Sequence, residues 1–344
     1  MKRKLTFIKC LVSVGFLILL SRMVNAEGFL KMFSHIELFP LTLSILVSVG
    51  MILVSCLKWN ILLGKAPPNM RFSFLVKLYL VGYYFSNLLP SNIGGDVFRV
   101  FYLGKAIKSQ SRAAASVFVE RFTGFLFLLV LVIIMPLFKK TMYQHPAIFL
   151  PSLGAFSVLA FLAWCSAFNN PLAKLERVAF GIIDFLRCRL QCSLKGYDVL
   201  KKITIRFFEA IQNFQEKTKQ TISILKDDRK SLYSVMGLTV LFYMLTWGNI
   251  YFSFSVFGIA PGLINIVVLT PVAMLMAMLP VSLGSLGLAE GVFVFYFGLA
   301  GVPVESALAM SLFVRFKVIV VSVLGMIFHF SMEQGKTGRS DRRA

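Results

Sequence analysis

Apolar runs of about twenty residues recur along the chain and alternate with short polar segments. A helix needs about 20 apolar residues to cross the hydrocarbon core of a bilayer, whereas a β-barrel would show alternating segments of about ten residues. The pattern therefore predicts an all-α polytopic membrane protein. Six runs are long enough for full crossings, at 5–24, 38–57, 113–138, 148–168, 232–257 and 302–330.

Two further apolar stretches are each interrupted by a polar break that contains glycine. The first stretch covers 72–89 and leads into a break at 87–99. This break reads Asn-Leu-Leu-Pro-Ser-Asn-Ile-Gly-Gly-Asp-Val-Phe-Arg. The second covers 261–279 and 286–300, with its break at 278–290. Both breaks read Leu-Pro-x-(Asn/Ser)-(Ile/Leu)-Gly-(Gly/Ser), which indicates an internal repeat with a broken helix in each copy.

Lysines and arginines flank the first broken stretch on both sides, so we expect it to enter from the cytoplasm and return there as a re-entrant helical pair. The prediction is about six full spans plus two re-entrant pairs, with eight full spans as the alternative. Each half then makes three crossings, so 1–138 and 139–330 have opposite orientations and form an inverted-topology repeat. Both termini are cytoplasmic in this topology, and 331–344 is a basic cytoplasmic tail.

The first run resembles a signal peptide in one respect, because Val24-Asn25-Ala26 suits a signal-peptidase site. The run is long for the apolar region of a signal, however, and Arg22 interrupts the approach to that site. Removing the run would also destroy the symmetry of the two halves. We therefore expect the first span to be retained.

Composition agrees with a membrane protein, since 58% of the 344 residues are apolar and 15% are charged. The formal net charge of +21 is typical of cytoplasmic loops that follow the positive-inside bias and contact anionic lipids. No basic domain stands apart from the membrane, which argues against nucleic-acid binding. The five cysteines form no CxxC motif and the three histidines are far apart, so we expect no metal site, disulfide framework or cofactor.

The one long hydrophilic segment, 169–230, holds thirteen lysines and arginines against seven acids, a balance of +6. Apolar residues recur in it at helical spacing, for example at Val199, Ile203 and Phe207. This spacing predicts an amphipathic helix on the inner leaflet or against the bundle. A plain connector between spans is an equally good interpretation.

Ionisable residues in and after the breaks are the candidates for function. Such a group near mid-bilayer costs about 2.5–3.5 kcal/mol and usually faces a partner or a polar cavity. An arginine follows each break inside an apolar helix, at Arg121 and Arg315. The glycines of the breaks allow close backbone approach, and the N-termini of half-helices suit a phosphate. The predicted binding residues are Asn92, Gly94, Gly95, Asp96, Arg99, Glu120, Arg121, Ser282, Gly284, Glu290 and Arg315.

Within this set, we expect the arginines to bind phosphate, Asn92 and Ser282 to form hydrogen bonds, and the carboxylates to balance the arginines or to couple to protons. A structural interpretation competes with this one. It pairs Glu120 with an arginine of another helix, and lets Arg99 and Lys317 extend to the membrane interface. In that case the small residues serve helix packing.

The paired motifs resemble those of the lysylphosphatidylglycerol synthase transmembrane-region family. The resemblance rests on the break at 87–99, on Val-Glu-Arg-Phe-Thr-Gly at 119–124, on the break at 278–290 and on a later Phe-Val-Arg-Phe. It covers about residues 5–330. It implies an integral membrane fold and, as in the flippase half of multiple-peptide-resistance-factor proteins, movement of a charged phospholipid between leaflets. The sequence continues for only fourteen residues after Phe330, so we expect no soluble aminoacyl-transferase domain and no lipid synthesis by this chain.

Our leading hypothesis is a flippase-like transporter of the bacterial cytoplasmic membrane, with an anionic or phosphate-linked lipid head group in a polar cavity between the two re-entrant pairs. The alternative is a non-transporting partner that presents a lipid-linked substrate to a glycosyltransferase or lipid-modifying enzyme, with 169–230 as its docking surface. An intramembrane enzyme is a third interpretation, but the sequence offers no nucleophile or metal constellation for it. The oligomeric state is open.

Overall fold

The computed structural model describes residues 36–64, 71–88, 94–167, 229–279 and 281–340, together with single residues elsewhere. These ranges contain ten α-helices, two short 3₁₀ turns and no strand, which confirms the all-helical prediction for this part of the chain. The α-helices are α3 (Leu38–Leu63), α4 (Phe72–Leu88), α5 (Gly94–Ala106), α6 (Gln110–Ile134), α7 (Lys140–Tyr143), α8 (Pro146–Ala167), α11 (Arg229–Ser255), α12 (Leu263–Ala277), α13 (Leu288–Gly298) and α14 (Val304–Ser340). The 3₁₀ turns are η1 (Met135–Phe138) and η2 (Leu283–Ser285).

Five of the helical segments are long and apolar enough to cross a membrane. They are Leu38–Leu63, Gln110–Phe138, Pro146–Trp164, Arg229–Ser255 and Val304–Ser331, and they coincide with five of the six predicted spans. The remaining predicted span, 5–24, lies outside the described residues apart from isolated positions.

The chain divides into two compact units, residues 1–153 with 233–344 and residues 154–232. All contacts and cavities discussed below lie within the first unit. The predicted amphipathic segment 169–230 belongs to the second unit. Except for Ile205 and the start of α11, this segment lies outside the described residues.

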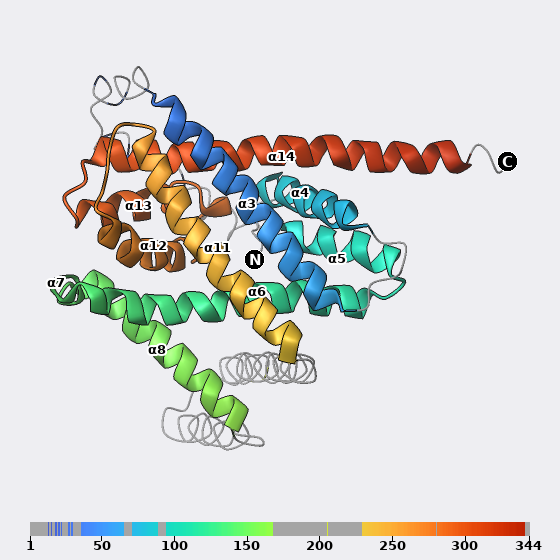
Figure 1. Ribbon diagram of the computed structural model, residues 1–344, viewed down its shortest axis with the longest axis horizontal. Helices are drawn as coiled ribbons and strands as arrows, with labels where there is room; N and C mark the ends of the chain where they lie inside the picture. Colours follow the sequence, from blue (N-terminus) through green and yellow to red (C-terminus); the bar gives the residue numbers. More distant parts are fainter. Residues whose placement is uncertain are drawn as a thin grey trace, which may run out of the picture. The chain divides into compact units, whose positions relative to one another are not determined.

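The first unit contains the same order of helices twice. A long helix, two short helices and a second long helix occur as α3, α4, α5 and α6, and again as α11, α12, α13 and α14. Figure 1 shows α6 and α14 along opposite sides, with the short pairs α4–α5 and α12–α13 between them. α4 and α13 pack against α14, whereas α5 and α12 pack against α6. Each of the two long helices α6 and α14 therefore contacts one short helix from each pair.

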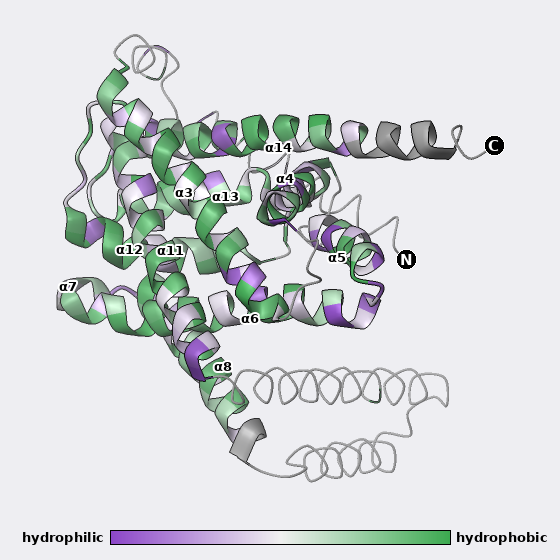
Figure 2. Ribbon diagram, turned by 45° about the vertical axis from the view of Figure 1, so that its right-hand side comes forward, coloured by the Kyte–Doolittle hydropathy of each residue, from purple (hydrophilic) through white to green (hydrophobic). Residues whose placement is uncertain are grey.

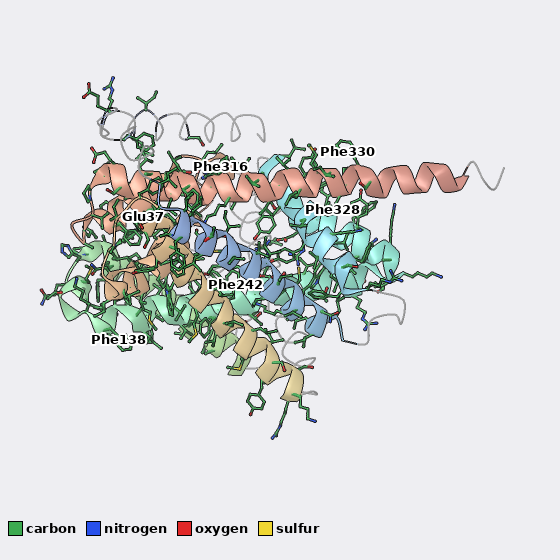
Figure 3. The ribbon with its side chains drawn as sticks, turned by 45° about the horizontal axis from the view of Figure 1, so that its top comes forward. Glu37, Phe138, Phe242, Phe316, Phe328 and Phe330 are labelled. Carbon is green, nitrogen blue, oxygen red and sulfur yellow. The ribbon has the colours of Figure 1, made fainter. Side chains whose placement is uncertain are left out.

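Large apolar side chains are exposed on the long helices. Figure 2 shows that α14 is hydrophobic over most of its length, with isolated hydrophilic positions. Phe316 and Phe330 are exposed and point away from the helix, whereas Phe328 packs against the core cluster that includes α4 residues (Figure 3). Soluble proteins rarely expose such extended apolar surface, so this surface and the five long apolar helices identify an integral membrane protein.

The short helices are held by direct backbone contact at glycines. A Cβ atom on Gly95 would lie 2.0 Å from the Gly82 carbonyl oxygen, so the backbones of α4 and α5 approach each other closely here. A Cβ on Gly325 would lie 2.1 Å from the Leu80 carbonyl oxygen, where α14 crosses α4. Close packing at small residues is the usual way in which membrane helices associate.

Candidate functional site

The second short helix of each pair carries an acid in its first turn, and this acid forms a salt bridge with an arginine on the following long helix. In the first copy, Arg121 of α6 donates to Asp96 of α5 at 3.0 Å. In the second, Arg315 of α14 donates to Glu290 of α13. The two pairs have the same sequence separation of 25 residues. We call them the first and second ion pairs.

The first copy has an additional, deeply buried salt bridge between Arg99 of α5 and Glu120 of α6. Their side chains are 2% and 6% exposed, and the distance from Arg99 Nη2 to Glu120 Oε2 is 2.8 Å. Arg99 lies between two aromatic rings, 4.1 Å from the centroid of Trp59 and 4.2 Å from that of Tyr79. The Tyr79 hydroxyl donates to the other oxygen of Glu120 at 3.2 Å. Ion pairing and cation–π contact fix this guanidinium within the helix packing.

The burial of Arg99 helps to decide between two roles for this residue, phosphate binding and a structural role. Its guanidinium faces Glu120 and also Asp96, at 3.3 Å. The competing structural interpretation let Arg99 extend to the membrane interface, but the side chain is only 2% exposed and is buried between the helices. This geometry favours the structural role of Arg99 over contact with a phosphate.

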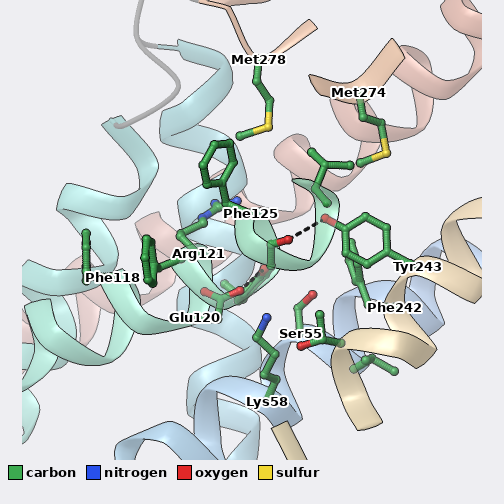
Figure 4. A pocket seen from close by; sticks show the side chains of 16 residues that line it. Ser55, Lys58, Phe118, Glu120, Arg121, Phe125, Phe242, Tyr243, Met274 and Met278 are labelled. Atoms are coloured by element: carbon green, nitrogen blue, oxygen red, sulfur yellow. Dashed lines mark hydrogen bonds between the residues drawn. The ribbon is translucent and has the colours of Figure 1, made fainter. Parts of the chain in front are cut away.

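Beside the first ion pair lies a cavity of about 350 Å³. Its polar and charged lining includes Ser55, Lys58, Glu120 and Arg121, and Figure 4 shows the Lys58 ammonium pointing into it below Glu120. The other walls are mostly apolar, with Phe118, Phe122, Phe125, Met274 and Met278 among them. We call this space the Lys58 cavity. Its lining comes from α3, α4, α6 and α11 and, through the two methionines, from α12 and the residue that follows it.

Lys58 was missed as a site residue because it follows the apolar run 38–57, whose end we took as the end of a span. The helix continues to Leu63, where Gly64 with a φ of 64° ends it and Arg112 donates to the Leu63 carbonyl oxygen at 2.8 Å. Lys58 is therefore inside α3 and is 6% exposed. Its ammonium makes no hydrogen bond or salt bridge with any residue that the structure describes.

The second ion pair lines a separate cavity of about 240 Å³. Arg315 also donates to the Ser285 carbonyl oxygen at 3.1 Å, and so holds the backbone of the second break. The second carboxylate oxygen of Glu290 is buried and has no partner within the described part of the chain. Asn87, at the end of α4, contributes to the lining from the other short pair. We call this space the Glu290 cavity.

The predicted site residues are thus divided between two cavities that have no lining residue in common. This differs from the single cavity that we expected between the re-entrant pairs. Glu120 and Arg121 line the first, and Gly284, Glu290 and Arg315 line the second.

The other predicted residues lie outside these linings. Gly94 and Gly95 are buried at the start of α5, and Gly95 serves the contact with Gly82. Ser282 is buried, and its hydroxyl lacks a partner among the described residues. Asn92 lies outside the described ranges.

Comparison with known proteins relates these features to a family. The model of the lysylphosphatidylglycerol synthase transmembrane region matches residues 6–325, nearly the whole chain. The chain belongs to this family. Its relatives include the UPF0104 membrane protein PH1989 of Pyrococcus horikoshii, which is 22% identical over 89% of this chain and 90% of the relative. A UPF0104 membrane protein of Methanothermobacter thermautotrophicus is 27% identical over 74% of this chain and 73% of the relative. No solved structure matches.

Proposed function

We propose that this member of the family is a lipid flippase-like transporter that moves an anionic, phosphate-linked lipid between the leaflets of the bacterial cytoplasmic membrane. The Lys58 cavity receives the head group in this proposal. The observation that carries it is a buried ammonium that forms no hydrogen bond or salt bridge with a described residue, next to an apolar wall and at the border of the two helix copies.

The charges around the Lys58 cavity favour a ligand with one negative charge. Two carboxylates, Asp96 and Glu120, face the two guanidinium groups of Arg99 and Arg121. Lys58 adds a third cation without a third acid among these neighbours. A buried charge without a salt-bridge partner costs roughly several kcal/mol of free energy. An anion that binds in the cavity reduces this cost, and its binding is more favourable by that amount. A phosphodiester carries a single negative charge and matches the imbalance.

The cavity wall suits the rest of a lipid. Its lining includes four phenylalanines and two methionines, and methionine adapts to ligands of variable shape. Arg121 is well placed to contact a phosphate while it remains tied to Asp96, because its side chain is 55% exposed. A guanidinium binds phosphate oxygens through charge-assisted hydrogen bonds.

The transport mechanism that we propose is alternating access between two inverted repeats. Six full spans and two re-entrant pairs place both termini in the cytoplasm, and the short pairs α4–α5 and α12–α13 enter from opposite faces. The repeated helix order and the equal spacing of the two ion pairs support this arrangement. The role needs no covalent step, and we assign no enzymatic activity to the chain.

A leaflet assay tests the proposal. Purified protein in liposomes is given a fluorescent phosphatidylglycerol, and a membrane-impermeant quencher measures how fast labelled lipid leaves the inner leaflet. We expect faster crossing than in empty liposomes, and little acceleration for a labelled neutral lipid. Equal rates with and without protein for every anionic lipid tested contradict the proposal.

A further inference from the structure

A second buried lysine, Lys317 of α14, lies in a cage of neutral oxygen atoms. Its ammonium donates to Ser44 Oγ of α3 at 2.6 Å, to Ser253 Oγ of α11 at 3.0 Å and to the side-chain oxygen of Asn249, also of α11. The residue is 9% exposed, so it does not extend to the interface as the structural interpretation of the sequence suggests. It forms no salt bridge with a carboxylate of a described residue. We call Lys317 with these three oxygen ligands the lysine cage.

The cage can satisfy both protonation states of the amine. An ammonium has three donors, and it meets three acceptors here. A neutral amine has two donors and one lone pair, and a serine hydroxyl can rotate to donate to that lone pair. Ser44 and Ser253 already lie 3.2 Å apart and share a hydrogen bond in which either can be the donor. A carboxylate in the cage would favour only the charged state, because it accepts but does not donate when ionised.

The acids that the sequence suggested for proton coupling are bound differently. Glu120 and Asp96 each accept a hydrogen bond from the guanidinium group of an arginine, so their partners are charged. Glu290 accepts from Arg315, two residues before Lys317 on α14. Lys317 differs from all three because its polar ligands are neutral.

Lys317 also has a small polar space beside it. A cavity of about 70 Å³ is lined by Lys317, Ser48, Tyr83 and Asn249, together with apolar residues of α3 and α14. This volume holds one or two water molecules, at about 30 Å³ each, and its lining offers the polar partners that a buried water needs. Val314 and Val318 line both this cavity and the Glu290 cavity. Among the described residues that line this cavity or bind the ammonium, the Tyr83 phenol of α4 is the titratable group that faces Lys317, and those of α3 and α11 are neutral.

We propose that Lys317 is a proton-exchange site within the membrane. Its ammonium passes one proton to water in the adjoining cavity and becomes a neutral amine in the same cage. The reverse step restores the ammonium, and no other bond forms or breaks. The existence of this site is independent of the lipid, while its use to drive transport rests on the proposed function.

Solid-state NMR of protein labelled with ¹⁵N on its lysine side chains, in lipid bilayers, tests the site. An amine nitrogen and an ammonium nitrogen give separate signals. We expect one lysine signal to convert from ammonium to amine as the pH is raised through the range in which the protein stays folded. The converting signal should be absent from Lys317→Met and present in the matched control Lys105→Met, which removes an exposed lysine of α5.

A second variant keeps the test decisive where Lys317→Met fails to fold. Asn249→Asp places a carboxylate in the cage and should hold Lys317 as an ammonium, so the conversion disappears while Lys317 is still present. A signal that stays an ammonium at every pH in the wild type overturns the proposal. So does a conversion that persists in Lys317→Met or is unchanged in Asn249→Asp.

The leaflet assay then tests whether proton exchange at Lys317 is coupled to lipid transport. With a pH gradient across the liposomes, we expect lipid crossing to respond to the gradient in the wild type and in Lys105→Met. The response should be lost in Lys317→Met and in the permanently charged Lys317→Arg. An NMR conversion without any lipid transport keeps the proton site and refutes the proposed function. Lipid transport without an NMR conversion keeps the proposed function and refutes the proton site.

Discussion

Replacing Lys58 by methionine tests the charge balance of the Lys58 cavity. Methionine has a similar length and retains the packing of the side-chain stem, so the variant removes mainly the ammonium. A charge-assisted hydrogen bond contributes about 1.5–3 kcal/mol. At about 1.4 kcal/mol for each tenfold change, loss of one such bond weakens binding of an anionic lipid by about tenfold to about 150-fold.

The stability of this variant should change in the opposite sense. Lys58 is 6% exposed and has no partner among the described residues, so its removal relieves the desolvation of a buried charge. We expect the thermal unfolding midpoint to be unchanged or higher.

The assay for Lys58→Met is a titration of purified protein in nanodiscs of neutral lipid with phosphatidylglycerol, followed by the leaflet assay in liposomes. Lys105→Met serves as the matched control, since it removes the same charge from an exposed position of α5. The reasoning is refuted if Lys58→Met binds the anionic lipid as the wild type does. An equal loss in Lys105→Met also refutes it, because the effect is then one of net charge and not of the cavity.

Three further variants distinguish residues that stabilise the fold from residues that contact the lipid. Glu120→Gln leaves the buried Arg99 with Asp96, at 3.3 Å, as its remaining charged partner among the described residues. Removing one partner of a buried ion pair typically lowers the free energy of unfolding by about 3–5 kcal/mol. Arg121→Gln breaks the first ion pair but leaves Asp96 paired with Arg99 at 3.3 Å, so we expect near-normal stability but weaker binding of anionic lipid. Gly95→Ala would place a Cβ 2.0 Å from the Gly82 carbonyl oxygen, and the shift of α5 should cost about 1–3 kcal/mol of stability. Thermal unfolding in detergent and lipid titration in nanodiscs measure all three.

A specific result would contradict each of these three predictions. A stable Glu120→Gln protein would show that Arg99 is balanced in another way. Lipid affinity that is unchanged in Arg121→Gln would assign the first ion pair to the scaffold alone. A Gly95→Ala variant as stable as the wild type would mean that α4 and α5 separate easily.

Local patterns predicted most of the helices. Five apolar runs became long helices, because the length needed to cross a bilayer is a direct property of the sequence. At each break one short helix ends and the next begins, α4 at Leu88 and α5 at Gly94 in the first copy, α12 at Ala277 and α13 at Leu288 in the second. The equal spacing of the two ion pairs was also present in the sequence. Arg121 and Arg315 were matched to each other there, but their partners were assigned only by the fold.

The lysines show where sequence reasoning failed. Lys58 was assigned to the flank of a span, because the apolar run ends one residue before it, whereas the helix end is set by Gly64. The sequence leaves Lys317 open between a functional role and extension to the interface. Its ligands Ser44 and Asn249 are 273 and 68 residues away along the chain, so no local pattern reveals them. No periodicity within α14 indicates polar partners on α3 and α11. Long-range contacts of this kind determine whether a membrane lysine is buried or exposed.

The two helix copies have the same order of helices and one ion pair each, but of the Lys58 and Glu290 cavities only the former is lined by a lysine. Each ion pair ties a short helix to the long helix that follows it, so α5 moves with α6 and α13 with α14 if the copies move against each other. The Lys58 cavity lies at such a border, because α6 forms one wall and the methionines of α12 and its end form another. A shift between the copies would therefore open or close this cavity without breaking either ion pair. The unpaired ammonium of Lys58 has no equivalent in the lining of the Glu290 cavity. Under the proposed function, an anion that binds Lys58 more tightly in one arrangement of the copies than in the other would shift the equilibrium between them.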